Sequence, residues 1–359
     1  MITYQYRLYP NKSQKSLLWI HANKLNYLYN YFLNQKIEEY KNNNKSISKV
    51  EQQKELVILK QNDETLKQIH SQVLQQVTDR LDKTYKSFFK RGFGFPNFRS
   101  CKNFFGICYP QSGFSIDKDT IHTKAYGNIK FTKHRECIGN IKRICISEKN
   151  DKWFLNITTD YRKEEVLSEK SIGIDVGIAN IVATSEGQII KNCSHQKYFD
   201  KKINELKSRR DKTCKKNSRR FKFLSSTIRK LYGVKDLKIN DFLHKVSKYL
   251  SSQYDTIFCE DLNLKDMSES EITGLNRELR NSQLGKFLSY LEYKTNHLVK
   301  VNPINTSKMC CKCGKIHEMK LSNRTMICEC GYVEDRDINA AKNIYCLGQA
   351  IIASQLCIA

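Results

Sequence analysis

Several common features are missing from this chain of 359 residues. It contains no run of about 18 apolar residues, so we expect no membrane-spanning helix. The opening residues, MITYQYRLYP, lack the charged and apolar regions of a signal peptide, so we expect the chain to stay inside the cell. Internal repeats are absent, and low complexity is limited to polar stretches such as KNNNKSISK. At about 150 residues per domain, this length predicts two or three domains.

Acidic residues are scarce relative to basic ones. The chain has 37 Asp and Glu against 62 Lys and Arg, which gives a formal net charge of +25. Residues 201–230 hold 13 basic and two acidic residues, a net charge of +11. Such a run can be a solvated helix face, but a chain this basic favours a polyanionic partner. Nucleic acid is favoured over a membrane surface, because no strongly amphipathic helix rich in lysine, tryptophan and leucine is present.

The first half of the chain predicts a β-structure interrupted by helices. Alternation predicts a strand at residues 2–9, and helical spacing of apolar residues follows over about 11–91, capped by Asn11 or Ser13. From 92 to 165, short alternating segments separated by turns predict strands. We expect the first strand to pair with these strands and complete a small β-barrel.

The second half alternates strands with helices. An apolar strand and two further strands are expected from residue 171, then a basic helical region over 201–232 and a separate amphipathic helix, DLKINDFLHKVSKYLSSQ. A strand ending in acids, DTIFCEDLNL, comes next, followed by another helix, SQLGKFLSYLEYKTNHL. This alternation predicts an α/β domain.

Five of the 14 cysteines lie close together near the C-terminal end. Cys310-x-x-Cys313 is followed after 14 residues by Cys328-x-Cys330. Two pairs of thiolates on tight turns can converge on a tetrahedral Zn²⁺, and four protein ligands make such a site structural. Because the second pair is one residue shorter than usual, Cys311 or His317 remains an alternative ligand.

The other nine cysteines are scattered. We interpret them as mostly reduced, small buried residues, with Cys101, Cys145 and Cys259 as examples.

Three carboxylates occupy distinctive places. Asp175 ends an apolar strand in GIDVGIAN, Glu260 ends another in IFCEDLNL, and Asp337 begins a helix in EDRDINAAKN. Any one alone is more often a cap or a solvated terminus, but together they match a ribonuclease H-like core. Carboxylates in such a cluster hold two Mg²⁺ ions about 3.5–4 Å apart for phosphodiester hydrolysis. Asp335 is expected to cap the last helix, and it is the next candidate if Asp337 is not the ligand.

In this order the motifs resemble the TnpB family of transposon-encoded RNA-guided nucleases, which is related to type V CRISPR effectors and to Fanzor proteins. The segments that carry the resemblance are YRLYPNKSQ, NYLYNYFLNQKIEEY, LDKTYKSFFKR, GFPNFRS, GIDVGIAN, FCEDLNL, LGKFLSYLEYK, TSKMCCKCG with CECG, and DRDINAAKNI. They span nearly the whole chain, and the ordered set is far more specific than any single motif.

The resemblance implies an α+β multidomain fold. It comprises a wedge β-barrel with an inserted helical recognition lobe, and a RuvC-like nuclease domain with an inserted zinc ribbon. The boundaries are 1–10 and 92–165 for the barrel, 11–91 for the recognition lobe, 166–300 and 331–359 for the nuclease, and 301–330 for the ribbon.

The resemblance also implies activity and partners. A guide RNA from the transposon end would direct double-strand cleavage of DNA beside a short adjacent motif. Asp175, Glu260 and Asp337 would hold two catalytic Mg²⁺ ions, and the four cysteines would hold one structural Zn²⁺. The helical lobe and a barrel loop would read the adjacent motif, through Lys49, Gln53, Gln72, Gln75 and Gln111. The basic segment would contact phosphates, through Arg209, Arg210, Lys215, Lys216, Arg219 and Arg220.

Rival interpretations differ in class. A catalytically weak RNA-guided DNA-binding regulator would have lost a carboxylate, and none of the three is lost. A strand-transferring transposase would need end binding and synaptic assembly, which no motif indicates. A eukaryotic Fanzor-type nuclease would be nuclear, with residues 207–220 as an import signal. Otherwise we expect a monomeric ribonucleoprotein in the cytoplasm or nucleoid of a prokaryote, with no membrane partner.

Overall fold

The computed structural model describes residues 1–91, 94–161, 170–262, 283–319 and 323–356. The chain divides into two compact units, Met1–Lys163 and Glu164–Ala359. Within the described residues, no helix is both long and apolar enough to cross a membrane. The junction predicted at 165/166 and the barrel boundary at 92 lie outside the described residues.

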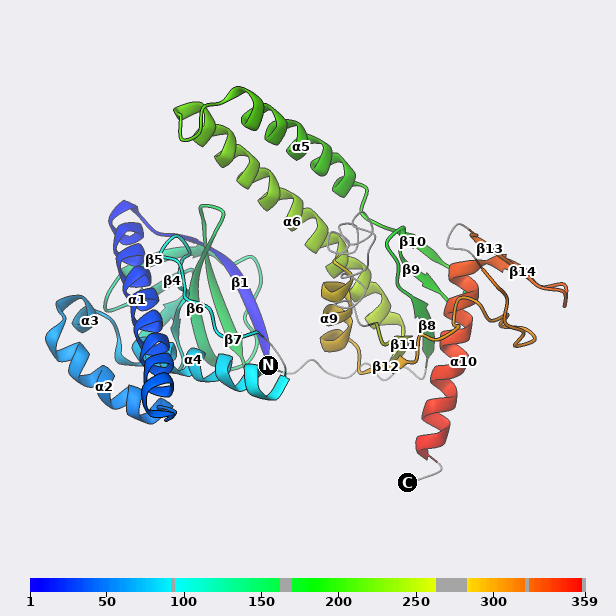
Figure 1. Cartoon of the computed structure of the whole chain (residues 1–359), viewed down its shortest axis with the longest axis horizontal. Coiled ribbons are helices and arrows are strands. Elements are labelled where there is room, and N and C mark those ends of the chain that lie inside the picture. Colours follow the sequence, from blue (N-terminus) through cyan, green and yellow to red (C-terminus); the bar gives the residue numbers. More distant parts are fainter. Residues whose placement is uncertain (92–93, 162–169, 263–282, 320–322, 357–359) are drawn as a thin grey trace. The chain divides into compact units, whose positions relative to one another are not determined.

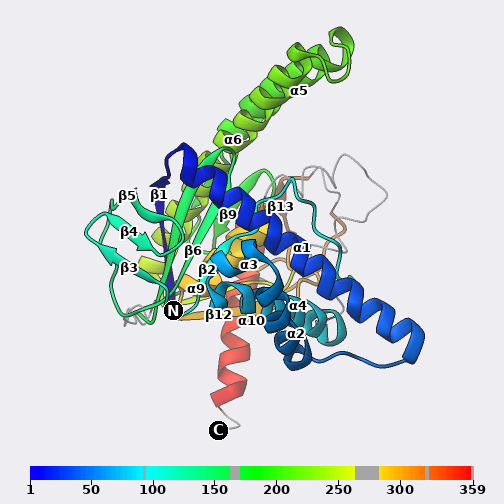
Figure 2. The same ribbon diagram turned by 90° about the vertical axis from the view of Figure 1, so that its left-hand side faces the viewer.

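The first unit joins a seven-stranded antiparallel sheet to four helices (Figure 1, Figure 2). The strand order is β2-β6-β7-β1-β5-β4-β3. The strands are β1 (Ile2–Tyr9), β2 (Ile107–Tyr109), β3 (Phe114–Asp117), β4 (Thr120–Thr123), β5 (Gly127–Thr132), β6 (Ile141–Lys149) and β7 (Lys152–Thr159). The helices are α1 (Lys12–Asn43), α2 (Lys49–Asn62), α3 (Glu64–Gln68) and α4 (Ser71–Arg91).

The N-terminal strand pairs inside this sheet, as predicted. β1 lies between β7 and β5, antiparallel to both. The two edge strands, β2 and β3, are joined by a short turn, and the ring centroids of Tyr109 and Phe114 are 6.3 Å apart across it. The sheet is therefore a nearly closed antiparallel barrel.

Of the two predicted caps, Asn11 and Ser13, the structure places Asn11 at the N-cap of helix α1. The side chain of Asn11 accepts a hydrogen bond from the backbone of Gln14, and the side chain of Gln14 bonds back to Asn11, so the two form a capping box. One face of α1 is buried against the barrel and α4, including Leu18, Leu25 and Phe32. The predicted strand at residues 2–9 and the predicted helix after it are thus confirmed, and Asn11 rather than Ser13 is the cap.

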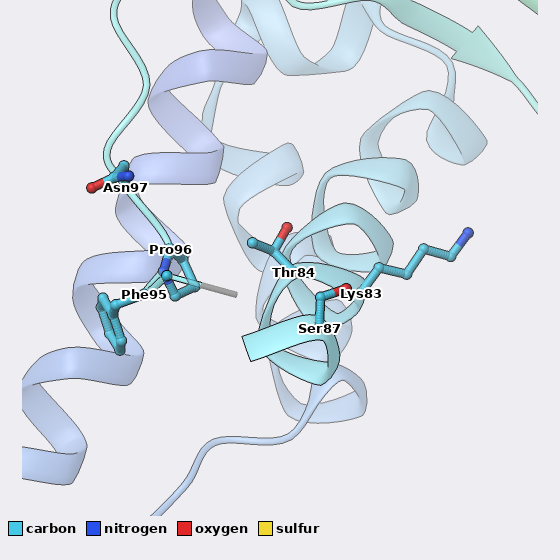
Figure 3. A pocket seen from close by; sticks show the side chains of 7 residues that line it. Lys83, Thr84, Ser87, Phe95, Pro96 and Asn97 are labelled. Carbon is cyan, nitrogen blue, oxygen red and sulfur yellow. The ribbon is translucent and has the colours of Figure 1, made fainter. Parts of the chain in front are cut away.

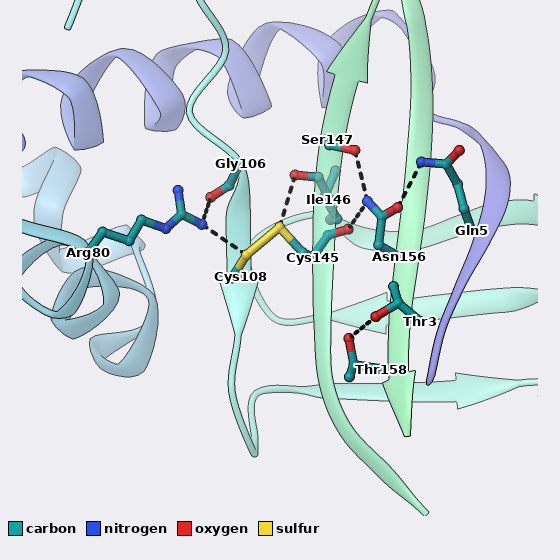
Figure 4. The surroundings of a disulfide bond; sticks show 10 residues. All are labelled: Thr3, Gln5, Arg80, Gly106, Cys108, Cys145, Ile146, Ser147, Asn156 and Thr158. Carbon is teal, nitrogen blue, oxygen red and sulfur yellow. Dashed lines mark hydrogen bonds between the residues drawn. A yellow bond between two sulfur atoms is a disulfide. The ribbon is translucent and has the colours of Figure 1, made fainter. Parts of the chain in front are cut away.

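One pair of cysteines corrects the sequence analysis. Cys108 on β2 and Cys145 on β6 are directly opposite in the antiparallel ladder, with Cα atoms 4.1 Å apart, and they form a disulfide (Figure 4). Cys101, expected to be buried, is exposed, whereas Cys259 is buried as expected. The cross-strand register, which spacing along the chain does not reveal, brings the paired thiols together.

The second unit contains a five-stranded sheet of order β10-β9-β8-β11-β12 (Figure 1). Its strands are β8 (Ser171–Asp175), β9 (Asn180–Thr184), β10 (Ile189–Lys191), β11 (Thr256–Glu260) and β12 (His297–Val301). A two-stranded ribbon consists of β13 (Thr325–Ile327) and β14 (Val333–Asp335). Among the described residues the helices are α5 (His195–Thr213), α6 (Arg219–Gln253), α9 (Leu284–Lys294) and α10 (Arg336–Leu356). Strands interleaved with helices confirm the predicted α/β character.

Helices α5 and α6 form a long antiparallel hairpin that extends away from the five-stranded sheet (Figure 1, Figure 2). The prediction of a basic helical region ending near 232 and a separate helix after it is wrong, because α6 is continuous from Arg219 to Gln253. Gly233 lies within it, and glycine costs about 1 kcal/mol in a helix. Burial of Leu224, Ile239 and other residues along α6 offsets this cost.

Candidate active site and cysteine cluster

Two of the predicted acids end neighbouring parallel strands. Asp175 is the last residue of β8, and Glu260 is the last residue of β11. The two strands are parallel, with Cys259 opposite Ile174. Their carboxyl ends therefore meet at one edge of the sheet, which brings Asp175 beside Glu260.

Helix α10 lies directly on β8. A Cβ atom placed on Gly173 would be 2.3 Å from the carbonyl oxygen of Ala341 and 2.7 Å from Cβ of Tyr345. Ser171 lies 3.4 Å from the hydroxyl of Tyr345, so the same strand face meets α10 two residues earlier. Because side chains alternate along a strand, Asp175 shares this face and points toward the N-terminal end of α10.

Strand β11 meets the same helix. Phe258 packs edge-on against Tyr345, with ring centroids 5.8 Å apart, and it lies against Gly348, where a Cβ would clash with its ring. Glu260 is two residues beyond Phe258 and so also faces α10. Asp337 lies in the first turn of that helix. β8, β11 and α10 thus carry the three predicted acids to one place.

Asp335 caps α10, as predicted. Its Oδ1 accepts hydrogen bonds from the backbone nitrogen of Asp337 at 2.8 Å and from that of Ile338 at 3.4 Å. A side-chain acceptor at this position satisfies backbone N–H groups that a helix start leaves free. Asp335 therefore fixes the helix turn that presents Asp337.

The acids share an electrostatic environment that opposes ionisation. Burial, followed by the negative charges of Glu260 and Asp337, raises the pKa of Asp175 from its ordinary 3.8 to about 7. Arg336 acts in the opposite direction. Burial also raises the pKa of Glu260, and a hydrogen bond from Thr306 partly opposes that shift.

Two polar neighbours of the acids were missed by sequence reasoning. Asn180, at the start of β9, donates from Nδ2 to Oδ2 of Asp337 at 3.0 Å. Thr306 donates from its hydroxyl to Oε1 of Glu260. Asn180 lies in the quoted motif GIDVGIAN and could have been singled out, whereas nothing in the sequence ties Thr306 to an acid 46 residues away.

The donor set fits divalent cations. The charges of Glu260 and Asp337 help to raise the pKa of Asp175, and bound cations would neutralise this cluster of negative charge. Oxygen-only ligands suit hard ions such as Mg²⁺. Among the described residues, only four cysteines place one ligand atom each within 4.8 Å of one another, so the acids are spread more widely. A pair of ions about 3.5–4 Å apart needs such a wider spread.

The four predicted cysteines converge. Their sulfurs lie within 4.8 Å of one another, with Sγ of Cys310 3.8 Å from that of Cys330 and Sγ of Cys313 3.4 Å from that of Cys328. Zn–S bonds of about 2.3 Å in a tetrahedron place sulfurs about 3.8 Å apart. The short second pair closes as a turn, because the Gly331 nitrogen donates to the carbonyl of Cys328 at 3.0 Å. The cluster is suited to hold a metal, and it fits Zn²⁺.

The two alternative ligands lie outside this set of four. Cys311 belongs to no metal-ligand group among the described residues. Nε2 of His317 is 3.2 Å from Sγ of Cys328, which is hydrogen-bonding distance to a ligand sulfur. Although burial opposes ionisation of Cys310, backbone N–H groups of Cys313 and Lys312 lower its pKa to about 7.

The predicted phosphate-contacting residues gather at the end of the α5–α6 hairpin. Arg209 lies near the end of α5, Lys215 and Lys216 lie in the connecting turn, and Arg219 and Arg220 begin α6. These five side chains are exposed. Arg210 instead pairs with Asp211 and stacks on Phe221, with its guanidinium 5.0 Å from the ring centroid.

The predicted motif-reading residues belong to three connected elements. Lys49 on α2 forms an ion pair with Asp79 on α4 at 3.1 Å, and Gln53 of α2 lies 3.4 Å from Thr78 of α4. Gln72 of α4 accepts a hydrogen bond from the backbone of Ser112, beside exposed Gln111. Gln75 is exposed on α4. The structure brings the five together, and their DNA-binding role stays a prediction.

A hollow of about 430 Å³ lies elsewhere in the first unit (Figure 3). Residues near the end of α4 and in the loop after it line the hollow: Lys83, Thr84, Ser87, Gly94, Phe95, Pro96 and Asn97. None of the predicted catalytic, metal-binding or nucleic-acid-binding residues is among them.

Three family models match successive parts of the chain. Residues 145–271 match the family described as "Probable transposase", and residues 285–344 match "Cas12f1-like, TNB domain". Residues 1–45 match a "Helix-turn-helix domain". In this chain, these first residues form strand β1 and one long helix, α1, rather than two helices around a turn.

Two relatives are similar to this chain over about half or nearly all of its length. A protein of Escherichia coli K12 with the name "Putative RNA-guided DNA endonuclease InsQ" is 27% identical over 98% of this chain and 93% of its own length. A TnpB-like protein of Methanocaldococcus jannaschii is 31% identical over 49% of this chain and 68% of its own length.

A solved structure shares the fold. A Cas12f1 chain, from a complex with guide RNA and target DNA, superposes with a TM-score of 0.59 over 93% of this chain and 82% of its own length, at 16% identity. The ordered motifs, the family models and the similarity to the archaeal relative agree on one assignment. This chain belongs to the TnpB family.

Proposed function

We propose that this TnpB-family protein is an RNA-guided DNA endonuclease, and that Asp175, Glu260 and Asp337 are its catalytic acids. Its similarity to proteins named as RNA-guided DNA endonucleases, over nearly their whole length, supports the activity. The convergence of the three carboxylates from β8, β11 and α10 carries the assignment of the residues.

Two Mg²⁺ ions bound by these acids would activate the attacking water and stabilise the leaving oxygen of the phosphodiester. The protein's part is to hold the carboxylates in place. Asn180 restrains Asp337 through its Oδ2, and Asp335 fixes the turn that presents Asp337. The close contact of β8 and α10 at Gly173 sets the separation between Asp175 and Asp337.

The basic end of the α5–α6 hairpin is proposed to bind phosphates of the guide RNA or of the RNA–DNA heteroduplex. Its exposed side chains carry positive charge, and the N-terminus of α6 adds the positive end of a helix dipole beside Arg219. Guide pairing reads the sequence, so the protein needs charge here more than base contacts. α2, α4 and the turn at Gln111 are proposed to read the adjacent DNA motif.

The cysteine cluster is proposed to hold one structural Zn²⁺. Its loop is fastened to the helix of Asp337, because Nδ2 of Asn339 donates to the carbonyl of Met309 at 2.7 Å and Oδ1 of Asn339 accepts from the backbone of Cys311 at 3.0 Å. Folding of the metal loop and seating of α10 are thereby linked. We further propose a monomeric ribonucleoprotein in the cytoplasm or nucleoid of a prokaryote, or in the nucleus if the host is eukaryotic.

Parallel cleavage and binding assays test this function. Asp175→Ala, Glu260→Ala and Asp337→Ala should each abolish plasmid cleavage by the protein with its guide RNA, while gel shifts show target binding close to wild type. Near-normal cleavage by Asp337→Ala would make Asp335 the ligand. Guided binding without cleavage by the wild-type protein in Mg²⁺ would instead make it an RNA-guided DNA-binding regulator.

A further inference from the structure

We propose that Thr306 is a positioning residue that sets the direction of the Glu260 carboxylate, and that Asn343 of α10 holds Thr306 in place. This inference rests on the proposed function, because it assumes that Glu260 binds the catalytic metal.

The first step is the contact with the acid. The hydroxyl of Thr306 donates to Oε1 of Glu260, and the Thr306 side chain is buried. The carbonyl of Pro303, 3.1 Å from the same hydroxyl, is a second acceptor for its single hydrogen. A charge-assisted bond to a carboxylate is about twice as strong as a neutral one, so Glu260 takes the hydrogen whenever it is ionised, as binding of a metal ion requires. With Oε1 held by Thr306, Oε2 is the oxygen of Glu260 that remains for a metal ion.

The second step is what fixes Thr306. Nδ2 of Asn343 donates to the backbone carbonyl of Thr306 at 2.8 Å and to that of Met309 at 2.6 Å. Asn343 is buried, so breaking these bonds would leave its amide unsatisfied. The loop before the cysteine cluster is thus bonded at two carbonyls to the helix that carries Asp337.

Together these bonds form one mechanical unit. α10 carries Asp337 in its first turn and, through Asn343 and Thr306, also orients Glu260. Asp337 and Glu260 come from segments far apart in sequence, but the position of the single helix α10 determines how both carboxylates are oriented. A displacement of the Thr306 loop would rotate the Glu260 side chain without moving its backbone, because Glu260 ends β11 and pairs with Val301 of β12.

Thr306→Val removes the hydroxyl and keeps the shape of the side chain. Thr306→Ser restores the donor and serves as the rescue variant. Thr295→Val is a matched control, because Thr295 is a buried threonine of the same unit whose hydroxyl donates to the backbone carbonyl of Leu291 at 2.6 Å. Glu260→Ala reports whether the metal site itself is assigned correctly.

The measurements are Mn²⁺ binding to the RNA-free full-length chain, by electron paramagnetic resonance, and the Mg²⁺ dependence of cleavage by the complex with guide RNA. Residues that hydrogen-bond to a metal ligand typically contribute about 10–100-fold to metal affinity or activity. We expect Thr306→Val to weaken Mn²⁺ binding and raise the half-saturating Mg²⁺ by about tenfold. Target binding should be unchanged, and Thr306→Ser and Thr295→Val should behave like wild type.

The outcomes separate the two levels of inference. If Glu260→Ala lowers metal binding and cleavage but Thr306→Val matches wild type in both, the positioning role is wrong and the proposed function stands. If Thr306→Val and Thr295→Val lose equal metal affinity, the effect is general destabilisation, and the positioning role is again wrong. If Glu260→Ala leaves both readouts unchanged, the proposed catalytic site itself is wrong.

Discussion

Gly173 of β8 and Ala341 of α10 touch backbone to backbone, and a Cβ on Gly173 would lie 2.3 Å from the carbonyl oxygen of Ala341. No flexible side chain can move aside there, so any larger residue must push the helix off the strand. Because Asp337 lies one helical turn before Ala341, this contact also determines the position of Asp337 relative to strand β8.

Gly173→Ala should therefore weaken both folding and cleavage. Overpacking of this kind costs about 1–3 kcal/mol, and displacement of α10 moves Asp337 away from Asp175. Scanning calorimetry and plasmid cleavage measure the two effects. Gly94→Ala is the control, because a Cβ there meets no atom within 4 Å. A Gly173→Ala variant that cuts and unfolds like wild type would refute the tight contact.

Asp175 should make the metal-free protein less stable as pH rises. Burial and the charges of Glu260 and Asp337 raise its pKa to about 7 in the folded state, above the ordinary 3.8. Between these values the folded chain binds a proton that the unfolded chain has lost, so stability falls as pH rises from about 4 to about 7 and is level above that. Asp175→Asn removes this loss.

In magnesium-free buffer at pH 8, Asp175→Asn should melt several degrees above wild type, with a smaller difference at pH 5. Mg²⁺ should raise the Tm of wild type and have less effect on the variant, because bound cations stabilise only the ionised cluster. Equal Tm values for the two proteins at both pH values would show that burial and neighbouring charges do not raise the pKa of Asp175 in the folded protein.

Local signals in the sequence predicted much of this site. An acid at the end of an apolar strand can be recognised from the neighbouring residues. Asp335 lies two residues before Asp337 at the start of a helix, which predicts that it is a cap. The cysteine spacing likewise predicted which four sulfurs converge. In each case the deciding information lies within a few residues of the position concerned.

What could not be predicted depends on register and on distant contacts. Cys108 and Cys145 pair across 37 residues because β2 and β6 align in one register, which neither segment specifies alone. Thr306 reaches Glu260 only after β12 and its loop have folded. The helix break expected near Gly233 is absent because packing along α6 outweighs the local propensity. Long-range packing decides all three.

Zinc content should identify the ligands of the cysteine cluster. Replacing both Cys328 and Cys330 by serine should lower bound zinc from one ion per chain and destabilise the second unit, since a structural metal contributes folding free energy. His317→Ala and Cys311→Ser should keep full zinc content, because neither residue belongs to the group of four sulfurs. Metal analysis by mass spectrometry decides this. Full zinc in the double variant, or loss in His317→Ala, would reassign the fourth ligand.

Charge at the end of the α5–α6 hairpin should set the salt dependence of RNA binding. Lys215 and Lys216 lie in the turn between the helices and are exposed, so Lys215→Glu with Lys216→Glu should leave the fold intact. Each lost phosphate contact should make the plot of log affinity against log salt shallower by about 0.7–0.9. The double variant should bind guide RNA more weakly whatever the sequence of the RNA. Its preference for the adjacent DNA motif should be unchanged.

The matched control makes the same charge change nearer the other end of α6. Lys238→Glu with Lys248→Glu alters two exposed lysines of the same helix, and it should leave the salt slope closer to wild type than the hairpin variant does. Affinities from filter binding at several salt concentrations give both slopes. Equal slopes for wild type and the hairpin variant, with equal affinity, would show that this end of the hairpin is only a solvated face. Equal losses in both variants would mean that the net charge of the chain, rather than this surface, drives binding.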